Sequence, residues 1–257
     1  MKAETPCYVY ITGYGRSGST IAELLLGEIL PECVTFGEVR YVHNEYHSRD
    51  ICSCGESRAS CQFWGDQRLN DSVIAMNNQL DRSFPESEVL HLSISSFIQR
   101  VSELRESEIN FVVDSSKNAT GAFLRPLKLL RVFKNTKVLF VYRPFRDVMK
   151  SIYKGYNREK VESKLFRGKF SRVVRSFLVY VLSYLVNSYL QLTGRALRVN
   201  YVDMIENYSA TSIRILEYLG VDKNSFHENG QVVTGFNSHL ISGNRLAKSL
   251  PMTIQKK

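Results

Sequence analysis

A glycine-rich loop near the start of the chain constrains the fold more than any other feature. Its sequence, Gly-Tyr-Gly-Arg-Ser-Gly-Ser-Thr, occupies residues 13–20. Residues 7–12 before it alternate Tyr, Val and Ile as a strand does, and residues 20–30 after it carry apolar side chains at helical spacing. Unpaired N–H groups and the helix dipole favour negative charge where such a helix begins. The loop therefore predicts a phosphate site at the end of the first strand.

Strand-like and helix-like runs alternate along the rest of the chain. Further strands are expected at residues 34–36, 111–113, 137–142 and 197–201, a helix at 211–219, and loops at 50–67 and 226–242. This alternation is typical of a parallel sheet with crossover helices. We predict an α/β fold, a single P-loop-type three-layer domain over residues 1–257, with a central mostly parallel sheet flanked by helices.

The residues inside the loop narrow the ligand. Gly13 and Gly18 have the spacing of a Walker A loop, but Ser19 stands where that loop needs its Lys. Hydrolysis of ATP or GTP is therefore disfavoured. The positive charge lies at Arg16 instead, and further hydroxyl donors come from Ser17, Ser19 and Thr20.

Gly15-Arg16-Ser17-Gly18-Ser19-Thr20 resembles the 5′-phosphosulfate loop of sulfotransferases that use 3′-phosphoadenosine 5′-phosphosulfate (PAPS). Arg143 and Ser151, eight positions apart, resemble the family's grip on the 3′-phosphate, although Pro144-Phe145 departs from the usual order. Arg supplies a planar donor fork for phosphate. The resemblance extends from about residue 8 to residue 245.

Two further segments carry the same resemblance. Tyr201-Val202-Asp203-Met204 is similar to a family segment that implies Tyr201 lies near the adenine. Residues 239–245 look like a segment of bacterial relatives, and Arg245 is assigned there to the 3′-phosphate. The donor-binding residues implied by the resemblance are Gly15, Arg16, Ser17, Gly18, Ser19, Thr20, Arg143, Ser151, Tyr201 and Arg245.

The resemblance also implies a catalytic set. Glu38 follows a glycine after a short strand and is expected to take the proton of the acceptor, with His43 and His47 as runner-up bases. Arg16 and Lys117, the latter in an Asp-Ser-Ser-Lys segment, would stabilise the charge of the transferring group. The reaction expected is in-line transfer of a sulfuryl group from PAPS to an acceptor hydroxyl, releasing 3′,5′-ADP, and no metal is expected.

Three cysteines cluster at Cys52, Cys54 and Cys61. A structural or acceptor-side loop is the favoured interpretation. A zinc site with His43 or His47 as the fourth donor and a redox pair are the alternatives, because a structural zinc needs four donors.

The formal net charge of +9 favours anionic partners. Carbohydrate or glycolipid is the favoured acceptor, and nucleic acid is not an expected partner. The alternatives are an atypical P-loop small-molecule kinase and a basic polyanion-binding module without activity. No export signal is visible, so a cytoplasmic protein is expected. Residues 177–192 are expected as a buried helix, and the basic residues of 164–175 could touch an anionic membrane. The oligomeric state is left open.

Overall fold

The fold is built around a five-stranded sheet. The computed structural model describes residues 5–42, 51–105, 108–116, 123–158, 169–225, 232–233, 238–241 and 252–253. The strands, in chain order, are β1 (Cys7–Thr12), β2 (Cys33–Thr35), β3 (Phe111–Asp114), β4 (Thr136–Tyr142) and β5 (Ala196–Asn200). They lie in the order β2-β3-β1-β4-β5, and every pairing is parallel. The predicted α/β fold with a parallel sheet is confirmed.

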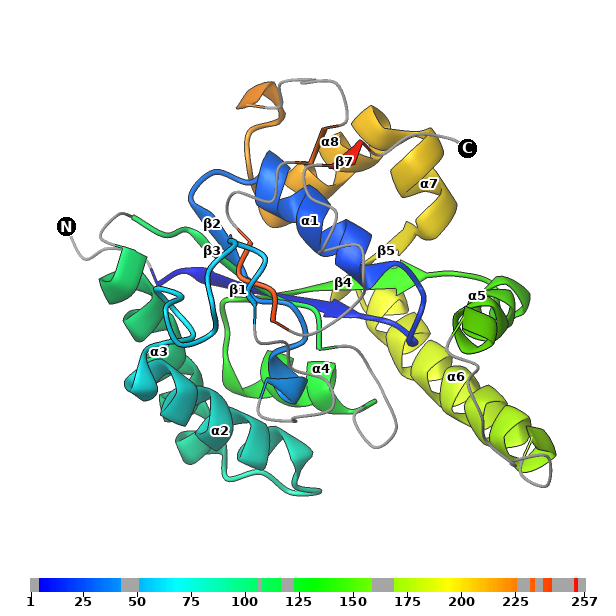
Figure 1. Ribbon diagram of the computed structural model, residues 1–257, viewed down its shortest axis with the longest axis horizontal. Helices are drawn as coiled ribbons and strands as arrows, with labels where there is room; N and C mark the ends of the chain where they lie inside the picture. The colour runs from blue at the N-terminus through cyan, green and yellow to red at the C-terminus, as the bar shows by residue number, and fades with distance from the viewer. Residues whose placement is uncertain are drawn as a thin grey trace.

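Helices cover both faces of the sheet (Figure 1). The helices, in chain order, are α1 (Ser19–Ile29), α2 (Gln67–Asp81), α3 (Ser87–Arg105), α4 (Arg125–Val132), α5 (Phe145–Arg158), α6 (Lys169–Leu192), α7 (Tyr201–Glu206) and α8 (Tyr208–Leu219). Figure 1 places α1, α7 and α8 on one side of the sheet and α2, α3, α4 and α6 on the other. Short pieces complete the described chain: η1 (Val39–Tyr41), η2 (Lys223–Ser225) and an antiparallel pair, β6 (Val232–Val233) with β7 (Met252–Thr253).

The side-chain alternation of β1 divides the core into two layers. Val9 and Ile11 pack in one cluster with residues of α1 and α8, including Leu24. Tyr8 and Tyr10 belong to the opposite cluster, which contains the apolar residues of α2 and α3. Because both faces of β1 are buried, apolar side chains follow one another along the strand instead of alternating with polar ones.

The strand order sets the position of the functional edge. β1 lies between β3 and β4, and the chain leaves β1 toward β2 on one side before it returns through β3 to β4 on the other. Ligands of open α/β sheets bind outside the carboxyl ends of the strands at such a reversal. The glycine loop follows β1 there, and Arg143 follows β4 directly.

Helix α6 differs from the prediction of a buried helix over residues 177–192. One face is buried through Ser183, Asn187 and Leu190, and Thr12 Oγ1 donates a hydrogen bond of 3.0 Å to Asn187 Oδ1. The other face is exposed, so the prediction of burial is wrong for that face. The large apolar residues exposed on this helix are Val174, Phe177, Leu178, Leu182, Leu185, Tyr189 and Leu192. None of the helices in the described residues combines the length and the apolarity needed to cross a membrane.

Candidate functional site

The glycine loop between β1 and α1 is tightly enclosed by its neighbours. Gly13 and Gly18 have φ values of 142° and 102°, in the region that favours glycine. A Cβ atom at Gly13 would lie 2.5 Å from the carbonyl oxygen of Val141, and one at Gly18 would lie 2.3 Å from Cδ2 of Tyr201. A Cβ atom at Gly15 would meet no heavy atom within 4 Å. The loop is therefore closed toward β4 and Tyr201 and open at Gly15.

The start of α1 has the features of an anion site. Gly18 is the N-cap, and as a glycine it offers no side chain to cap the first turn. The hydroxyl of Ser19 is buried and has no hydrogen-bond partner among the described residues. A buried polar group without a partner costs about 1–3 kcal/mol. A phosphate or sulfate oxygen would satisfy both the Ser19 hydroxyl and the free N–H groups of the first turn.

Arg143 joins this loop from the end of β4. Its Nη1 donates to the carbonyl oxygen of Arg16 at 3.2 Å, and its guanidinium carbon lies 4.2 Å from the ring centroid of Tyr201. The structure therefore brings together Arg16, Gly18, Arg143 and Tyr201, which the sequence assigns to one ligand. Because Arg143 covers a face of the Tyr201 ring, Tyr201 supports this arginine as well as the loop.

Ser151 lies in α5, two turns after the helix begins, and is half-buried. The pairing of Ser151 with Arg143 stays a prediction. Lys117, Arg245, His43 and His47 lie outside the described residues.

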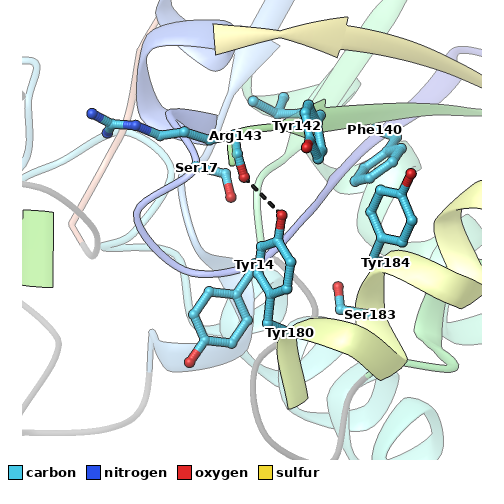
Figure 2. A pocket seen from close by; sticks show the side chains of 9 residues that line it. Tyr14, Ser17, Phe140, Tyr142, Arg143, Tyr180, Ser183 and Tyr184 are labelled. Atoms are coloured by element: carbon cyan, nitrogen blue, oxygen red, sulfur yellow. Dashed lines mark hydrogen bonds between the residues drawn. The ribbon is translucent and has the colours of Figure 1, made fainter. Parts of the chain in front are cut away.

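A pocket of about 190 Å³ opens beside Arg143 (Figure 2). The carbonyl oxygen of Arg143 accepts a hydrogen bond of 3.0 Å from the hydroxyl of Tyr180, whereas its guanidinium points away from Tyr180 (Figure 2). The pocket is small and open to solvent, so it would hold only part of a ligand. It is mostly aromatic, lined by Tyr14, Ser17, Phe140, Val141, Tyr142, Arg143, Tyr180, Ser183 and Tyr184.

A buried carboxyl group connects the loop helix to the segment that carries Glu38. Glu23, on α1, accepts hydrogen bonds of 2.5 Å from the backbone N–H of Gly37 and from Oγ of Ser115. Burial raises the pKa of Glu23 to about 8, against the lowering effect of these two hydrogen bonds. Glu38 follows Gly37 at the start of η1 and is half-buried. Glu23 thus fixes the backbone turn that presents Glu38.

Sequence reasoning did not identify Glu23. The signal available was one acidic residue within an apolar helical run, between Ala22 and Leu24. Charged side chains are almost never fully buried without partners, so a Glu at a core position of a helix predicts a polar contact there.

The end of β3 is held by a second buried carboxyl group. Asp114 accepts hydrogen bonds from the hydroxyl of Tyr8 at 2.8 Å and from the backbone N–H of Ser116 at 2.7 Å. Burial raises its pKa, and the nearby charge of Arg125 opposes the shift. The hydroxyl of Ser116 accepts the backbone N–H of Arg40 at 2.9 Å. These bonds connect the end of β3 to the segment after β2, which carries Glu38.

The cysteine cluster lies outside the glycine loop, near the end of β2. Its three sulfurs and a nitrogen of His239 all lie within 4.8 Å of one another. Hydrogen bonding to Cys52 lowers the pKa of the Cys61 thiol, with a further contribution from His239 and against the effect of burial. The same hydrogen bond, together with burial, raises the pKa of Cys52. The zinc alternative raised from the sequence named His43 or His47 as the fourth donor and did not include His239, which is 178 positions after Cys61.

The fold and the site define an α/β protein with a parallel sheet and a glycine loop between its first strand and first helix. A family model described as the sulfotransferase family matches residues 6–225, so the chain belongs to that family. The protein is a sulfotransferase, an enzyme of a family whose general sulfonate donor is PAPS.

Solved structures of sulfotransferases are similar to this chain. The sulfotransferase domain from the olefin synthase of Synechococcus PCC 7002 is similar over 99% of this chain and 86% of that chain, with 18% identity and a TM-score of 0.50. The sulfotransferase domain from the curacin biosynthetic pathway covers 97% of this chain and 88% of its own, with 16% identity and a TM-score of 0.48. A sulfotransferase from Alicyclobacillus acidocaldarius covers 85% and 82%, with 14% identity and a TM-score of 0.46. No match is found among curated protein sequences.

Proposed function

We propose that this sulfotransferase uses PAPS as its donor and transfers the sulfuryl group to a hydroxyl of its acceptor, releasing 3′,5′-ADP. The observation that carries the proposal is the contact of Arg143 with the loop, through its bond of 3.2 Å to the carbonyl oxygen of Arg16. It joins a second cationic group to the uncapped start of α1. Two anion-binding groups from different strand ends suit a nucleotide that is phosphorylated at both its 5′ and 3′ positions.

The donor contacts divide between the two groups. The loop from Gly15 to Thr20 would hold the 5′-phosphosulfate, with the unpartnered hydroxyl of Ser19 as one donor. Arg143 would bind the 3′-phosphate, and Ser151 and Arg245 stay predictions for the same phosphate. Tyr201 would lie between the adenine and Arg143, since Arg143 covers a face of its ring.

The chemistry requires alignment and charge stabilisation. The acceptor oxygen forms a bond to sulfur while the bond from sulfur to the bridging phosphate oxygen breaks, and 3′,5′-ADP leaves. Glu38 would take the acceptor proton, a step worth roughly 10² to 10⁴ in rate. Arg16 and Lys117 would stabilise charge on the leaving phosphate and the sulfuryl oxygens.

The acceptor is proposed as a carbohydrate or a glycolipid. The pocket beside Arg143 supports a ring-bearing ligand, because five of its lining residues are Tyr or Phe, which offer ring faces together with hydroxyl groups. A single sulfotransferase domain over residues 1–257 stays a prediction.

Nucleotide binding to matched variants tests the donor. Arg143→Ala should weaken binding of 3′,5′-ADP by about tenfold to a hundredfold, because a charge-assisted hydrogen bond contributes about 1.5–3 kcal/mol. It should leave the affinity for 5′-AMP nearly unchanged. Arg146→Ala is the control, since Arg146 carries the same charge three positions along and is exposed. Isothermal titration calorimetry without Mg²⁺ measures both ligands on all three proteins.

The same titrations separate the rival functions. Equal losses for 3′,5′-ADP and 5′-AMP would remove the assignment of Arg143 to the 3′-phosphate. Binding of ATP only with Mg²⁺, and no binding of 3′,5′-ADP, would favour a small-molecule kinase. Transfer of label from radiolabelled PAPS to a panel of carbohydrate and glycolipid acceptors then tests the acceptor class.

A further inference from the structure

The cluster near the end of β2 combines three thiols and one imidazole from two distant parts of the chain. Sγ of Cys54 lies 3.9 Å from Sγ of Cys61. Nδ1 of His239 lies 3.5 Å from Sγ of Cys61 and 3.9 Å from Sγ of Cys52. All four atoms lie within 4.8 Å of one another.

These distances can be compared with those between the ligand atoms of a tetrahedral zinc ion. Zinc bonds of about 2.3 Å to sulfur and about 2.0–2.1 Å to nitrogen give edges of about 3.8 Å between two sulfurs and about 3.5 Å between sulfur and nitrogen. The Cys54–Cys61 distance of 3.9 Å and the Cys61–His239 distance of 3.5 Å match these edges, and the Cys52–His239 distance of 3.9 Å is about 0.4 Å longer than the edge between sulfur and nitrogen. We propose a closed, four-ligand structural zinc site made of Cys52, Cys54, Cys61 and His239.

A tight turn presents the first two thiols. The backbone N–H of Gly55 donates to the carbonyl oxygen of Cys52 at 3.0 Å, and the N–H of Cys52 donates to Glu56 at 2.9 Å. Gly55 has a φ of 95°, which the turn requires. The turn keeps the sulfurs of Cys52 and Cys54 close together, so that both can bind the same metal ion.

A second turn fixes Cys61. The N–H of Gly65 donates to the carbonyl oxygen of Cys61 at 2.8 Å. A Cβ atom at Gly65 would lie 2.3 Å from the carbonyl oxygen of Ala59, so only glycine fits this close approach.

The fourth donor is held by bonds on both sides of its backbone. The N–H of His239 donates to the carbonyl oxygen of Thr35 at 2.7 Å, and its own carbonyl oxygen accepts from Nε1 of Trp64 at 2.6 Å. The imidazole packs against the ring of Phe63, with centroids 4.5 Å apart. Ser53 Oγ donates to the carbonyl oxygen of Ser238 at 2.6 Å, which ties the two segments together.

The donor set selects the metal and the role. Thiolates with one imidazole in a tetrahedral arrangement suit Zn²⁺, and four protein ligands leave no position for water or substrate. The site is therefore structural. Its position connects it to the catalytic edge, because Phe63 and Trp64 pack on Phe36 with centroids 5.3 and 5.4 Å apart, two residues before Glu38.

Metal analysis tests the proposal. Protein purified without an affinity tag, from zinc-supplemented medium and under reducing conditions, should contain about one zinc per chain by mass spectrometry of the metals. Cys54→Ser, which changes the exposed thiol, should lose that zinc to a chelator that leaves the wild type loaded. Cys33→Ala and His91→Gln are the matched controls outside the cluster, and they should keep the metal.

A donor-preserving variant covers the case in which Cys54→Ser does not fold. His239→Cys should keep about one metal per chain, and its Co²⁺ form should show stronger thiolate charge-transfer absorption than wild-type Co²⁺ protein. Substoichiometric zinc in the wild type, equal zinc in the wild type and in folded Cys54→Ser, or a Cys54–Cys61 disulfide in zinc-free protein would each overturn the proposal. Nucleotide binding plays no part in this test, so its result is independent of the proposed function.

Discussion

Glu23 shows how a single residue can connect stability to the catalytic edge. Its carboxyl group is fully buried, and its pKa of about 8 lies above the value of 4.5 for an exposed Glu. The folded protein therefore holds a proton on Glu23 between these values that the unfolded chain has released. The contribution of Glu23 to the free energy of unfolding is present in full below pH 4.5 and is lost as the pH rises through about 8.

We expect Glu23→Gln to remove this dependence. The amide keeps the shape of the protonated acid, and it can still accept from Gly37 and bond to Ser115. The free energy of unfolding of the wild type should fall by about 1.4 kcal/mol per pH unit more than that of the variant between pH 4.5 and 8. Urea denaturation over a pH series measures the difference. Glu28→Gln, an exposed position on the same helix, should follow the wild type; identical slopes for Glu23→Gln would contradict the assignment.

Glu38 carries the prediction about catalysis. Glu38→Gln should lower turnover by roughly 10² to 10⁴, because the amide cannot take the acceptor proton, while the affinity for 3′,5′-ADP stays unchanged. Steady-state kinetics and calorimetry on the same preparation give both values. Glu56→Gln, exposed in the cysteine loop, serves as the control. An active Glu38→Gln enzyme would direct the search for a base to His43 and His47.

At the scale of elements, the glycine loop contains one glycine that the fold requires, Gly18, and one whose expected role concerns only the ligand, Gly15. Gly18→Ala places a Cβ atom 2.3 Å from Tyr201 at a φ of 102°, so it should lower both stability and nucleotide affinity. Such strain costs of order 1–3 kcal/mol. Gly15→Ala meets no heavy atom within 4 Å and should unfold like the wild type while binding 3′,5′-ADP more weakly. Thermal unfolding of the two variants, with and without 3′,5′-ADP, distinguishes these effects. An equal loss of stability in Gly18→Ala and Gly15→Ala would contradict the different roles given to the two glycines.

The elements predicted well from sequence are those whose signals are local. β1 was predicted at its observed bounds, and α8 ends at Gly220, whose φ of 79° is typical of a glycine after a helix. The burial of α6 was predicted wrongly on one face, because an apolar run shows that a helix can be buried but not which side meets the sheet. Helices α2 and α3 were not predicted, since their mixed polar and apolar sequence shows a clear face only once both pack together.

The residues that escaped prediction depend on the whole molecule. Arg16, Gly18, Arg143 and Tyr201 were assigned to one ligand through their resemblance to sulfotransferase motifs. The structure brings them together because their segments follow strands whose ends meet at one edge of the sheet. His239 could not be paired with the cysteines by spacing, since the fold alone brings that position beside β2. Local chemistry predicts what a segment can bind, whereas tertiary packing decides which segments share the ligand.

The bond between Trp64 and His239 has a consequence for the order of folding. It closes a separation of 175 positions in the chain, and Ser53 and Ser238 close one of 185. Closing long loops costs entropy before any contact repays it, and chains of this size commonly fold through intermediates. Trp64 is the single tryptophan of the sequence, so fluorescence excited selectively at tryptophan reports on the contact between Trp64 and His239. We expect stopped-flow fluorescence to lag behind far-ultraviolet circular dichroism during refolding; coincident time courses would show instead that the corner forms together with the sheet.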